Sequence, residues 1–126
     1  MADDVPSEAI QLTREFNGHF YTDVEINGSP VRVLVDTGAS GIALSRSDAQ
    51  RAGIAVSAGM FEVIGKGADG DVHGEEVRLD RVTLGSKTVE GMPAVVLDAG
   101  EQSLLGQSFL SKFDTVEIRG DTMVLR

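Results

Sequence analysis

The stretch Val33-Leu34-Val35-Asp36-Thr37-Gly38-Ala39-Ser40-Gly41 places an acidic residue directly after a run of apolar residues. The run is typical of a buried strand, so we expect the strand to end at Asp36 with the carboxylate only partly solvated. This local pattern supports two interpretations equally. Asp36 is either a chemically active acid at the strand end or the first residue of an ordinary turn, where Asp and Gly are both favoured.

Strand patterns continue on both sides of this stretch. From Phe20 to Ile26 the residues alternate with a period of two, which is typical of a half-buried strand. Asn27-Gly28 is a strong hairpin signal, and residues 31–35 provide the returning strand. Further strands are predicted at residues 60–64, 72–84, 88–97, 115–118 and 122–125, with turns at 85–87 and around 120–121.

Two short helices are predicted between the strands. Ser45, followed three residues later by Asp48, resembles a capping box, and Gly53 suits a C-terminal cap, so a helix is expected at residues 46–52. A second short helix is expected at residues 107–113. Together with about eight strands, this pattern predicts a mostly-β barrel or sandwich.

Length and composition restrict the class of protein. A chain of 126 residues corresponds to one domain, which we expect at residues 9–126 after a flexible tail at residues 1–8. The formal net charge of −9 argues against a nucleic-acid partner. The absence of cysteine excludes disulfides, thiolate nucleophiles and zinc–thiolate sites. The acidic N-terminus and the lack of a long apolar run predict a soluble chain with no membrane contact as given.

A second motif, Leu104-Leu105-Gly106-Gln107-Ser108-Phe109-Leu110, occurs near the C-terminus. Together with Val35-Asp36-Thr37-Gly38-Ala39-Ser40, it resembles the aspartic proteases of the retroviral (retropepsin) type, and in particular the bacterial single-domain family of clan AA. The resemblance extends over residues 18–125. It implies a mostly-β, retropepsin-like closed barrel of short antiparallel strands with one or two short helices. The implied activity is aspartic endopeptidase activity on a peptide or protein substrate, with no cofactor and no metal.

The resemblance also implies roles for individual residues. Asp36 would be the catalytic carboxylate, Thr37 would brace the paired loop through its hydroxyl, and Gly38 would let the substrate backbone approach closely. Leu105 and Gly106 would support the catalytic loop from beneath.

A β-hairpin flap covers the substrate in this family. The matching stretch is residues 63–72, which is rich in glycine and lies between two predicted strands. The implied substrate-binding and flap residues are Ala39, Ser40, Gly65, Gly67, Ala68, Asp69 and Gly70. The same glycines spell the Gly-x-Gly-x-x-Gly fingerprint of dinucleotide sites, but residues 71–79 have the spacing of a strand, so nucleotide binding is not expected.

Peptide hydrolysis by carboxylates needs one ionised acid to take a proton from water and one protonated acid to polarise the scissile carbonyl. Asp36 cannot be both, so a twofold homodimer is expected to supply a second Asp36. Residues 95–100 imitate the first motif, but Ala99 lacks the hydroxyl of Thr37, and the second motif follows too closely for another lobe. Asp98 is therefore predicted to lie in a surface turn.

Two positions depart from related enzymes. Ser40 stands where retroviral enzymes usually have an acid, and Ala39 stands where pepsin-like enzymes often have Ser.

Bacterial members usually carry a membrane helix before this domain, so the resemblance suggests a bacterial protein that is periplasmic or membrane-anchored in a longer form. His19 and His73 are too isolated to suggest a metal site. The alternatives are a non-catalytic dimerisation or peptide-binding module on the same fold and an unrelated β-barrel ligand-binding domain.

Overall fold

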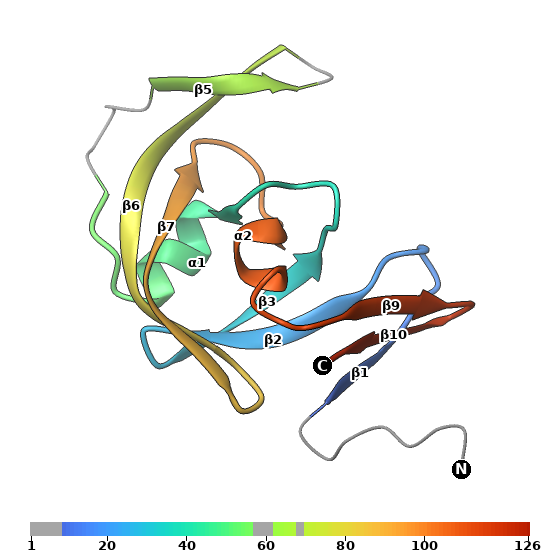
Figure 1. Ribbon diagram of the computed structural model, residues 1–126. Helices are drawn as coiled ribbons and strands as arrows, with labels where there is room; N and C mark the ends of the chain where they lie inside the picture. Colours follow the sequence, from blue (N-terminus) through green and yellow to red (C-terminus); the bar gives the residue numbers. More distant parts are fainter. Residues whose placement is uncertain (1–8, 57–61, 68–69) are drawn as a thin grey trace.

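The computed structural model describes residues 9–56, 62–67 and 70–126. The predicted tail at residues 1–8, the first two residues of the strand predicted at 60–64, and the flap residues Ala68 and Asp69 lie outside the described residues. The described elements (Figure 1) are β1 (Ile10–Thr13), β2 (Tyr21–Ile26), β3 (Ser29–Val35), β4 (Ile42–Leu44), α1 (Arg46–Arg51), β5 (Glu62–Gly67), β6 (Gly70–Leu84), β7 (Lys87–Leu97), β8 (Ser103–Leu105), α2 (Gln107–Leu110), β9 (Val116–Arg119) and β10 (Thr122–Leu125).

Six strands close a barrel (Figure 1). Neighbouring strands hydrogen-bond in the order β2-β3-β8-β4-β7-β6, and β2 pairs with β6 through Ile26 opposite Val82, which completes the ring. β5 pairs with β6 and extends the sheet beyond the ring. The prediction of a closed, mostly-β barrel with two short helices is confirmed.

Two features differ from the expected set of short antiparallel strands. β3 pairs with β8, and β4 with β7, in parallel, and β6 is 15 residues long. β8, which comes late in the chain, lies between β3 and β4 and pairs in parallel with β3 and antiparallel with β4. Parallel neighbours need long connections, and the connection from β4 to β7 contains α1 and the β5–β6 hairpin.

The β2–β3 hairpin turns at Asn27-Gly28, as predicted. Asn27 has a φ of 52° and Gly28 a φ of 87°, so both central residues are left-handed, as a type I′ turn requires. The Asn27 side-chain oxygen accepts hydrogen bonds from the N–H groups of Asp80 (2.8 Å) and Arg81 (3.2 Å). The hairpin turn is thereby fastened to β6, across the seam where the barrel closes.

The barrel interior is apolar. Among the described residues, the largest fully buried side chains come from the barrel strands, from α2 and from β10: Phe109, Ile26, Ile42, Leu44, Leu79, Leu105, Leu110, Met123, Leu125, Val24, Val31 and Val33. Phe109 in α2 also packs edge-on against Phe113, with the ring centroids 5.8 Å apart. The predicted second helix is shorter than expected, because α2 ends at Leu110 and residues 111–113 form a turn and a bend.

α1 begins at its predicted cap. Ser45 Oγ accepts a hydrogen bond from the Asp48 N–H (3.1 Å), and Gly53 follows the helix with a φ of 74°. The helix ends one residue earlier than predicted. The second half of the expected capping box is absent, since the Ser45 N–H donates to Ser103 Oγ (3.0 Å) instead of to the Asp48 side chain.

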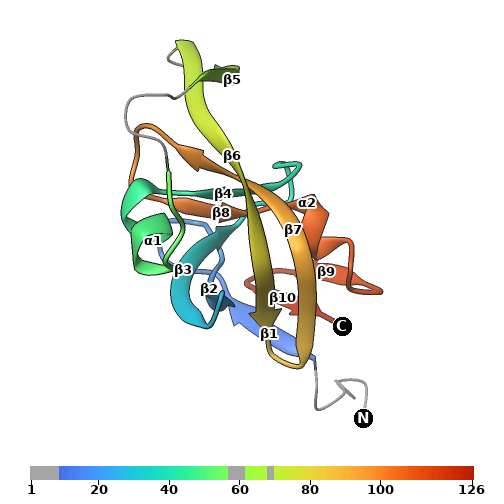
Figure 2. The same cartoon turned by 90° about the vertical axis from the view of Figure 1, so that its left-hand side faces the viewer.

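A separate three-stranded sheet combines the two described ends of the chain. β10 pairs antiparallel with both β1 and β9, so the predicted C-terminal hairpin is confirmed and β1 is an addition to it. Figure 2 shows this sheet at the opposite end of the molecule from the β5–β6 hairpin.

Candidate active site

Asp36 follows the last residue of β3 and lies in a tight turn. Its N–H donates to the Leu105 carbonyl (3.0 Å), so hydrogen bonding between β3 and β8 continues one residue past β3. Its Oδ1 accepts from the Gly38 N–H (3.0 Å), and its main-chain oxygen accepts from the Ala39 N–H (3.1 Å). The two local interpretations are therefore compatible: Asp36 begins a turn, and it is also held half-buried at the end of a barrel strand.

Gly106 lies directly against the loop that follows Asp36. A Cβ atom at this position would come within 2.5 Å of the Ala39 carbonyl oxygen and would also overlap the Gly41 carbonyl oxygen. Its φ of −108° is accessible to any residue. Glycine is needed here because two backbones approach closely, and not because of backbone freedom.

The residues after Gly106 hydrogen-bond to the same loop. The Gln107 N–H donates to the Ala39 carbonyl (2.8 Å), and the Ser108 N–H donates to the Ser40 carbonyl (2.8 Å). The Gln107 side chain donates through Nε2 to the Thr37 carbonyl (2.9 Å). The second motif thus holds the loop at three carbonyls, those of Thr37, Ala39 and Ser40.

A groove of about 940 Å³ lies between this loop and the β5–β6 hairpin. Its lining comprises residues 38–43 of the loop and β4, hairpin residues 62–66 and 72, residues 93–95 of β7, and Glu76, Leu104 and Ser108. The charged side chains in this lining are Glu62, Lys66 and Glu76. Of the predicted site residues, Gly38, Ala39, Ser40 and Gly65 line the groove.

Asp36 and Thr37 line a second, smaller cavity of about 300 Å³. Leu104 lines both hollows, so the second motif lies between them. The lining of the smaller cavity also includes Arg14, Phe20 and Ile118.

Two arginines fasten the loop at residues 14–20, which borders the smaller cavity. Arg14 donates to one main-chain carbonyl in this loop and to one in the β9–β10 turn, and its guanidinium lies 4.6 Å from the centroid of the Phe20 ring. Arg32 donates to the Glu15 carboxylate (2.7 Å), and this hydrogen bond raises the pKa of the Arg32 guanidinium, which stays charged. Sequence analysis missed both residues, because single arginines form no pattern that predicts such contacts.

A hairpin is present at the predicted place of the flap and projects from the barrel (Figures 1 and 2). Gly67 pairs with Gly70 at its far end. The register shifts between Val63 and Gly65, so Ile64 is an extra residue in β5 and forms a β-bulge.

Gly74 is a further residue that sequence analysis missed. A Cβ atom there would lie 2.8 Å from Ile64 Cδ1 and 2.9 Å from the Val96 carbonyl oxygen. The Ile64 side chain therefore packs over a position without a side chain. The available signal was a glycine inside a predicted strand, which often marks a close approach.

The two motifs set aside in the sequence have the expected structures. Asp98 lies in an exposed bend, and its carboxylate pairs with the Arg46 guanidinium. Residues 70–84 form a strand, so no helix follows the glycine fingerprint.

Among the described residues, no three His, Asp or Glu side chains are grouped to hold a metal ion. In the same part of the chain, neither helix has the length and apolar character needed to cross a membrane.

The sequence matches the family model described as aspartyl protease over residues 22–109. The "uncharacterized protein in cobV 5'region" of Sinorhizobium sp. is 35% identical, over 100% of this chain and 55% of that protein. The "uncharacterized protein RP867" of Rickettsia prowazekii (strain Madrid E) is 32% identical, over 92% of this chain and 50% of that protein. The chain thus spans about half the length of these curated relatives.

Two solved structures share the fold. The crystal structure of a retropepsin-like aspartic protease from Rickettsia conorii aligns with a TM-score of 0.77 and 29% identity, over 93% of this chain and 89% of that one. The EIAV protease in complex with the inhibitor HBY-793 aligns with a TM-score of 0.62 and 22% identity, over 80% of this chain and 93% of that one. The family match includes both Asp36 and Gly106. The chain therefore belongs to the aspartyl protease family and has the retropepsin-like fold.

Proposed function

We propose that this protein is an aspartic endopeptidase in which Asp36 is the catalytic carboxylate. The observation that carries the proposal is the placement of Asp36, which is fixed by hydrogen bonds at the end of β3, next to the loop that forms one wall of a groove of about 940 Å³. Membership of the aspartyl protease family supports it.

The proposed active form is a twofold homodimer, because one chain supplies one Asp36. The surface around Asp36 supports contact with a second copy. Ile118 lines the same cavity as Asp36 and is about half exposed, and Phe16 in the adjoining loop is fully exposed. Contact with a second copy at this surface would remove these apolar side chains from water.

In the dimer, the two Asp36 carboxylates share one proton, because like charges at hydrogen-bonding distance cannot both ionise. The ionised carboxylate takes a proton from water while the water oxygen bonds to the peptide carbonyl carbon. The protonated carboxyl donates its proton to the carbonyl oxygen. When the C–N bond of this tetrahedral intermediate breaks, the nitrogen receives a proton from the protonated carboxyl and leaves as an amine. One hydroxyl of the intermediate returns its proton to the other carboxylate, so the second product ends in a carboxyl group and the two Asp36 side chains again share one proton.

The remaining predicted residues take supporting roles in this proposal. Gly38, Ala39, Ser40 and Gly65 contact the substrate along the groove, and the β5–β6 hairpin closes over it as the flap. Thr37 braces the paired loop through its hydroxyl, while Leu105 and Gly106 support the loop from beneath.

The test compares Asp36→Asn with Asp98→Asn as a matched control, since Asp98 also follows an apolar strand but lies in an exposed bend. Cleavage of a peptide library is followed by mass spectrometry, while circular dichroism and sedimentation report fold and dimer. Asp36→Asn is expected to keep its fold and to lose hydrolysis by about 10²- to 10⁴-fold, the usual contribution of a general acid or base. Asp98→Asn is expected to cleave like the wild type.

Hydrolysis by Asp36→Asn at the wild-type rate would contradict the assignment. Loss of hydrolysis in Asp98→Asn alone would move the catalytic role to Asp98. A wild-type dimer that binds peptides but cleaves none would instead support the non-catalytic peptide-binding module.

A further inference from the structure

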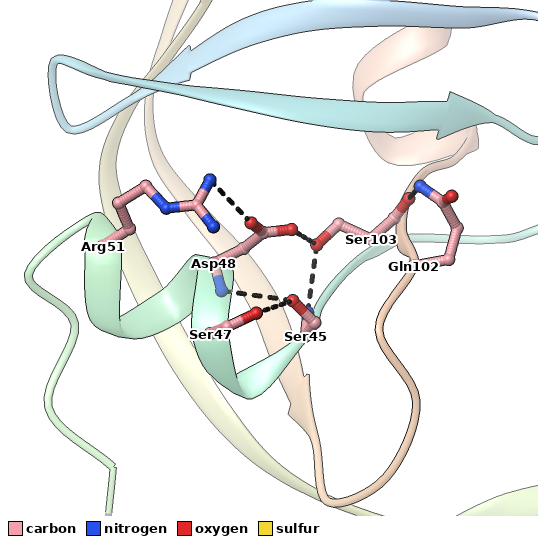
Figure 3. Close-up of polar contacts among 6 residues, drawn as sticks. All are labelled: Ser45, Ser47, Asp48, Arg51, Gln102 and Ser103. Carbon is pink, nitrogen blue, oxygen red and sulfur yellow. Dashed lines mark hydrogen bonds and ion pairs between the residues drawn. The ribbon is translucent and has the colours of Figure 1, made fainter.

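A buried polar cluster joins α1 to the start of β8 (Figure 3). Its members Ser45, Asp48 and Ser103 are buried, in a core that is otherwise apolar. The Ser103 hydroxyl donates to Asp48 Oδ2 (2.6 Å) and accepts from the Ser45 N–H (3.0 Å). The Asp48 N–H donates to Ser45 Oγ (3.1 Å). These three hydrogen bonds form a closed ring of Ser45, Asp48 and Ser103, which we call the Ser103 clamp.

The Asp48 carboxylate is almost fully removed from solvent. Its Oδ1 lies 3.3 Å from Nη1 of Arg51, a residue with a largely exposed side chain. Its Oδ2 accepts a hydrogen bond from the Ser103 hydroxyl. Burying a carboxylate costs free energy even when it is paired, and apolar residues of similar volume are often as stabilising. Net stability is therefore a weak reason for a polar side chain at this position, whereas a directional hydrogen bond from the Ser103 hydroxyl to an acceptor is a strong one.

The clamp holds one end of β8, and the Asp36 turn is bonded to the other end. β8 has three residues, with Ser103 opposite Val33 and Leu105 opposite Val35 in the parallel ladder. The Leu105 carbonyl accepts from the Asp36 N–H (3.0 Å). Only two residue steps of about 3.3 Å each separate Ser103 from the hydrogen bond between Leu105 and Asp36. A displacement of Ser103 along the strand therefore moves Leu105, and with it Asp36, by a similar distance.

We propose that Asp48 and Ser103 are positioning residues, which fix β8 along β3 and thereby set the position of Asp36 and of the loop above Gly106. β8 is short, and it pairs with β3 over three residues and with β4 through Leu104 opposite Ala43. The clamp adds bonds from α1 and from the end of β4, and it anchors β8 against movement along its axis. The consequence for hydrolysis rests on the proposed function, whereas the consequence for the loop geometry does not.

The test measures amide hydrogen exchange by NMR and, separately, kcat and KM for a cleaved peptide. The reporting amides are those of Asp36 and Gln107, which bond to Leu105 and Ala39, and the reference amides are those of the β6–β7 ladder. In Ser103→Ala, exchange at the reporting amides is expected to rise about tenfold more than at the reference amides, the scale set by removing one partner of a buried hydrogen bond. We also expect kcat to fall about tenfold with KM within about twofold, because a misplaced catalytic group slows the chemical step.

Three further variants separate positioning from stability. Arg51→Gln removes only the exposed ion pair of Asp48 and should match the wild type in all readouts. Asp48→Asn keeps an acceptor for the Ser103 hydroxyl and should retain loop protection and kcat. The double variant Asp48→Ala/Ser103→Ala removes the buried carboxylate together with its partner, so global stability should recover relative to Ser103→Ala. If Ser103→Ala does not fold, amide exchange and kcat are measured on the double variant instead.

In the double variant, the reporting amides should remain unprotected and kcat should remain low despite the recovered stability. An equal rise in exchange at reporting and reference amides in Ser103→Ala, or full recovery of loop protection in the double variant, would overturn the proposal. If the loop amides respond as expected but the wild type cleaves no peptide, the proposed function fails while the positioning role stands.

Discussion

Gly106 contacts two carbonyl oxygens of the Asp36 loop, so its missing side chain is a steric requirement of the site. Gly106→Ala places a methyl group where the Ala39 and Gly41 carbonyls now lie, and backbone must move to accommodate it. We expect the free energy of unfolding, measured by urea denaturation, to fall by about 1–3 kcal/mol, the usual cost of overpacking.

Gly41→Ala is the matched control for this substitution. It adds the same methyl group to the same loop, but the nearest atom, Ser108 Oγ, would be 3.9 Å away, an ordinary contact. Its free energy of unfolding should change by no more than about 0.5 kcal/mol. Equal destabilisation by both variants would contradict the steric argument.

Single residues also mark the limit of what local sequence predicts. The apolar run before Asp36 correctly predicted a strand end, and the spacing of Ser45 and Asp48 correctly predicted a helix start. The partner of Asp48 was not predictable, because Ser103 lies 55 residues away and is brought to α1 by the barrel. The spacing of residues along the sequence indicates which side chains are neighbours within one helical turn. It carries no information about the Ser103 hydroxyl, which comes from another strand.

At the scale of elements, β6 of the β5–β6 hairpin begins at Gly70, which has a φ of 115°. Gly70→Ala forces an L-residue into a backbone region that costs it about 1–2 kcal/mol. Because the hairpin is the proposed flap, we expect kcat/KM to fall about five- to thirtyfold, the equivalent of that free energy. Steady-state kinetics on one cleaved peptide measure the effect.

Gly100→Ala controls for strain elsewhere. Gly100 has a φ of 99°, has no atom near its missing Cβ, and lies in the loop between β7 and β8, outside the groove lining. This variant should keep the wild-type kcat/KM. If both variants lose activity to the same extent, the hairpin has no special role in turnover.

The elements that sequence predicted are those with a complete local signal. The β2–β3 hairpin has alternating residues on both strands and Asn27-Gly28 between them, and it occurs as expected. β4 and β8 have three residues each, which is too short for a period of two to be visible. They become strands because β3 and β7 offer them ladder partners, so their pairing is a property of the assembled barrel.

At the scale of the whole molecule, the number and spacing of the strands predict a mostly-β barrel or sandwich, and the resemblance implies that the barrel is closed, but neither predicts the strand order. β8 inserts between β3 and β4 and pairs in parallel with β3, and this crossing brings the second motif beneath Asp36. The two motifs together resemble the retropepsin type of protease, and this resemblance predicted that they would lie in contact. The periodicity of the strands alone did not predict this contact. The contact between the two motifs was therefore predictable from the resemblance, while the Ser103 clamp required the tertiary structure.

The proposed homodimer brings together two chains of the same net charge. Each copy carries −9, and like-charged proteins repel over about one Debye length, ~10 Å at 0.1 M salt. If the active form is the homodimer, added salt should screen this repulsion and strengthen association. Sedimentation equilibrium at fixed pH, from about 0.01 M to about 0.5 M salt, should show the dimer dissociation constant falling by about tenfold or more.

Specific activity provides the second readout of this prediction, because only the dimer holds two Asp36 carboxylates. At low salt, activity should rise faster than linearly with protein concentration, and at high salt it should approach linearity as the dimer becomes fully populated. Asp36→Asn serves as the control for association, since it should show the same salt dependence in the centrifuge without hydrolysis. Activity that stays strictly linear down to concentrations where the centrifuge detects only a monomer would contradict the dimer, because a single chain would then supply both acids.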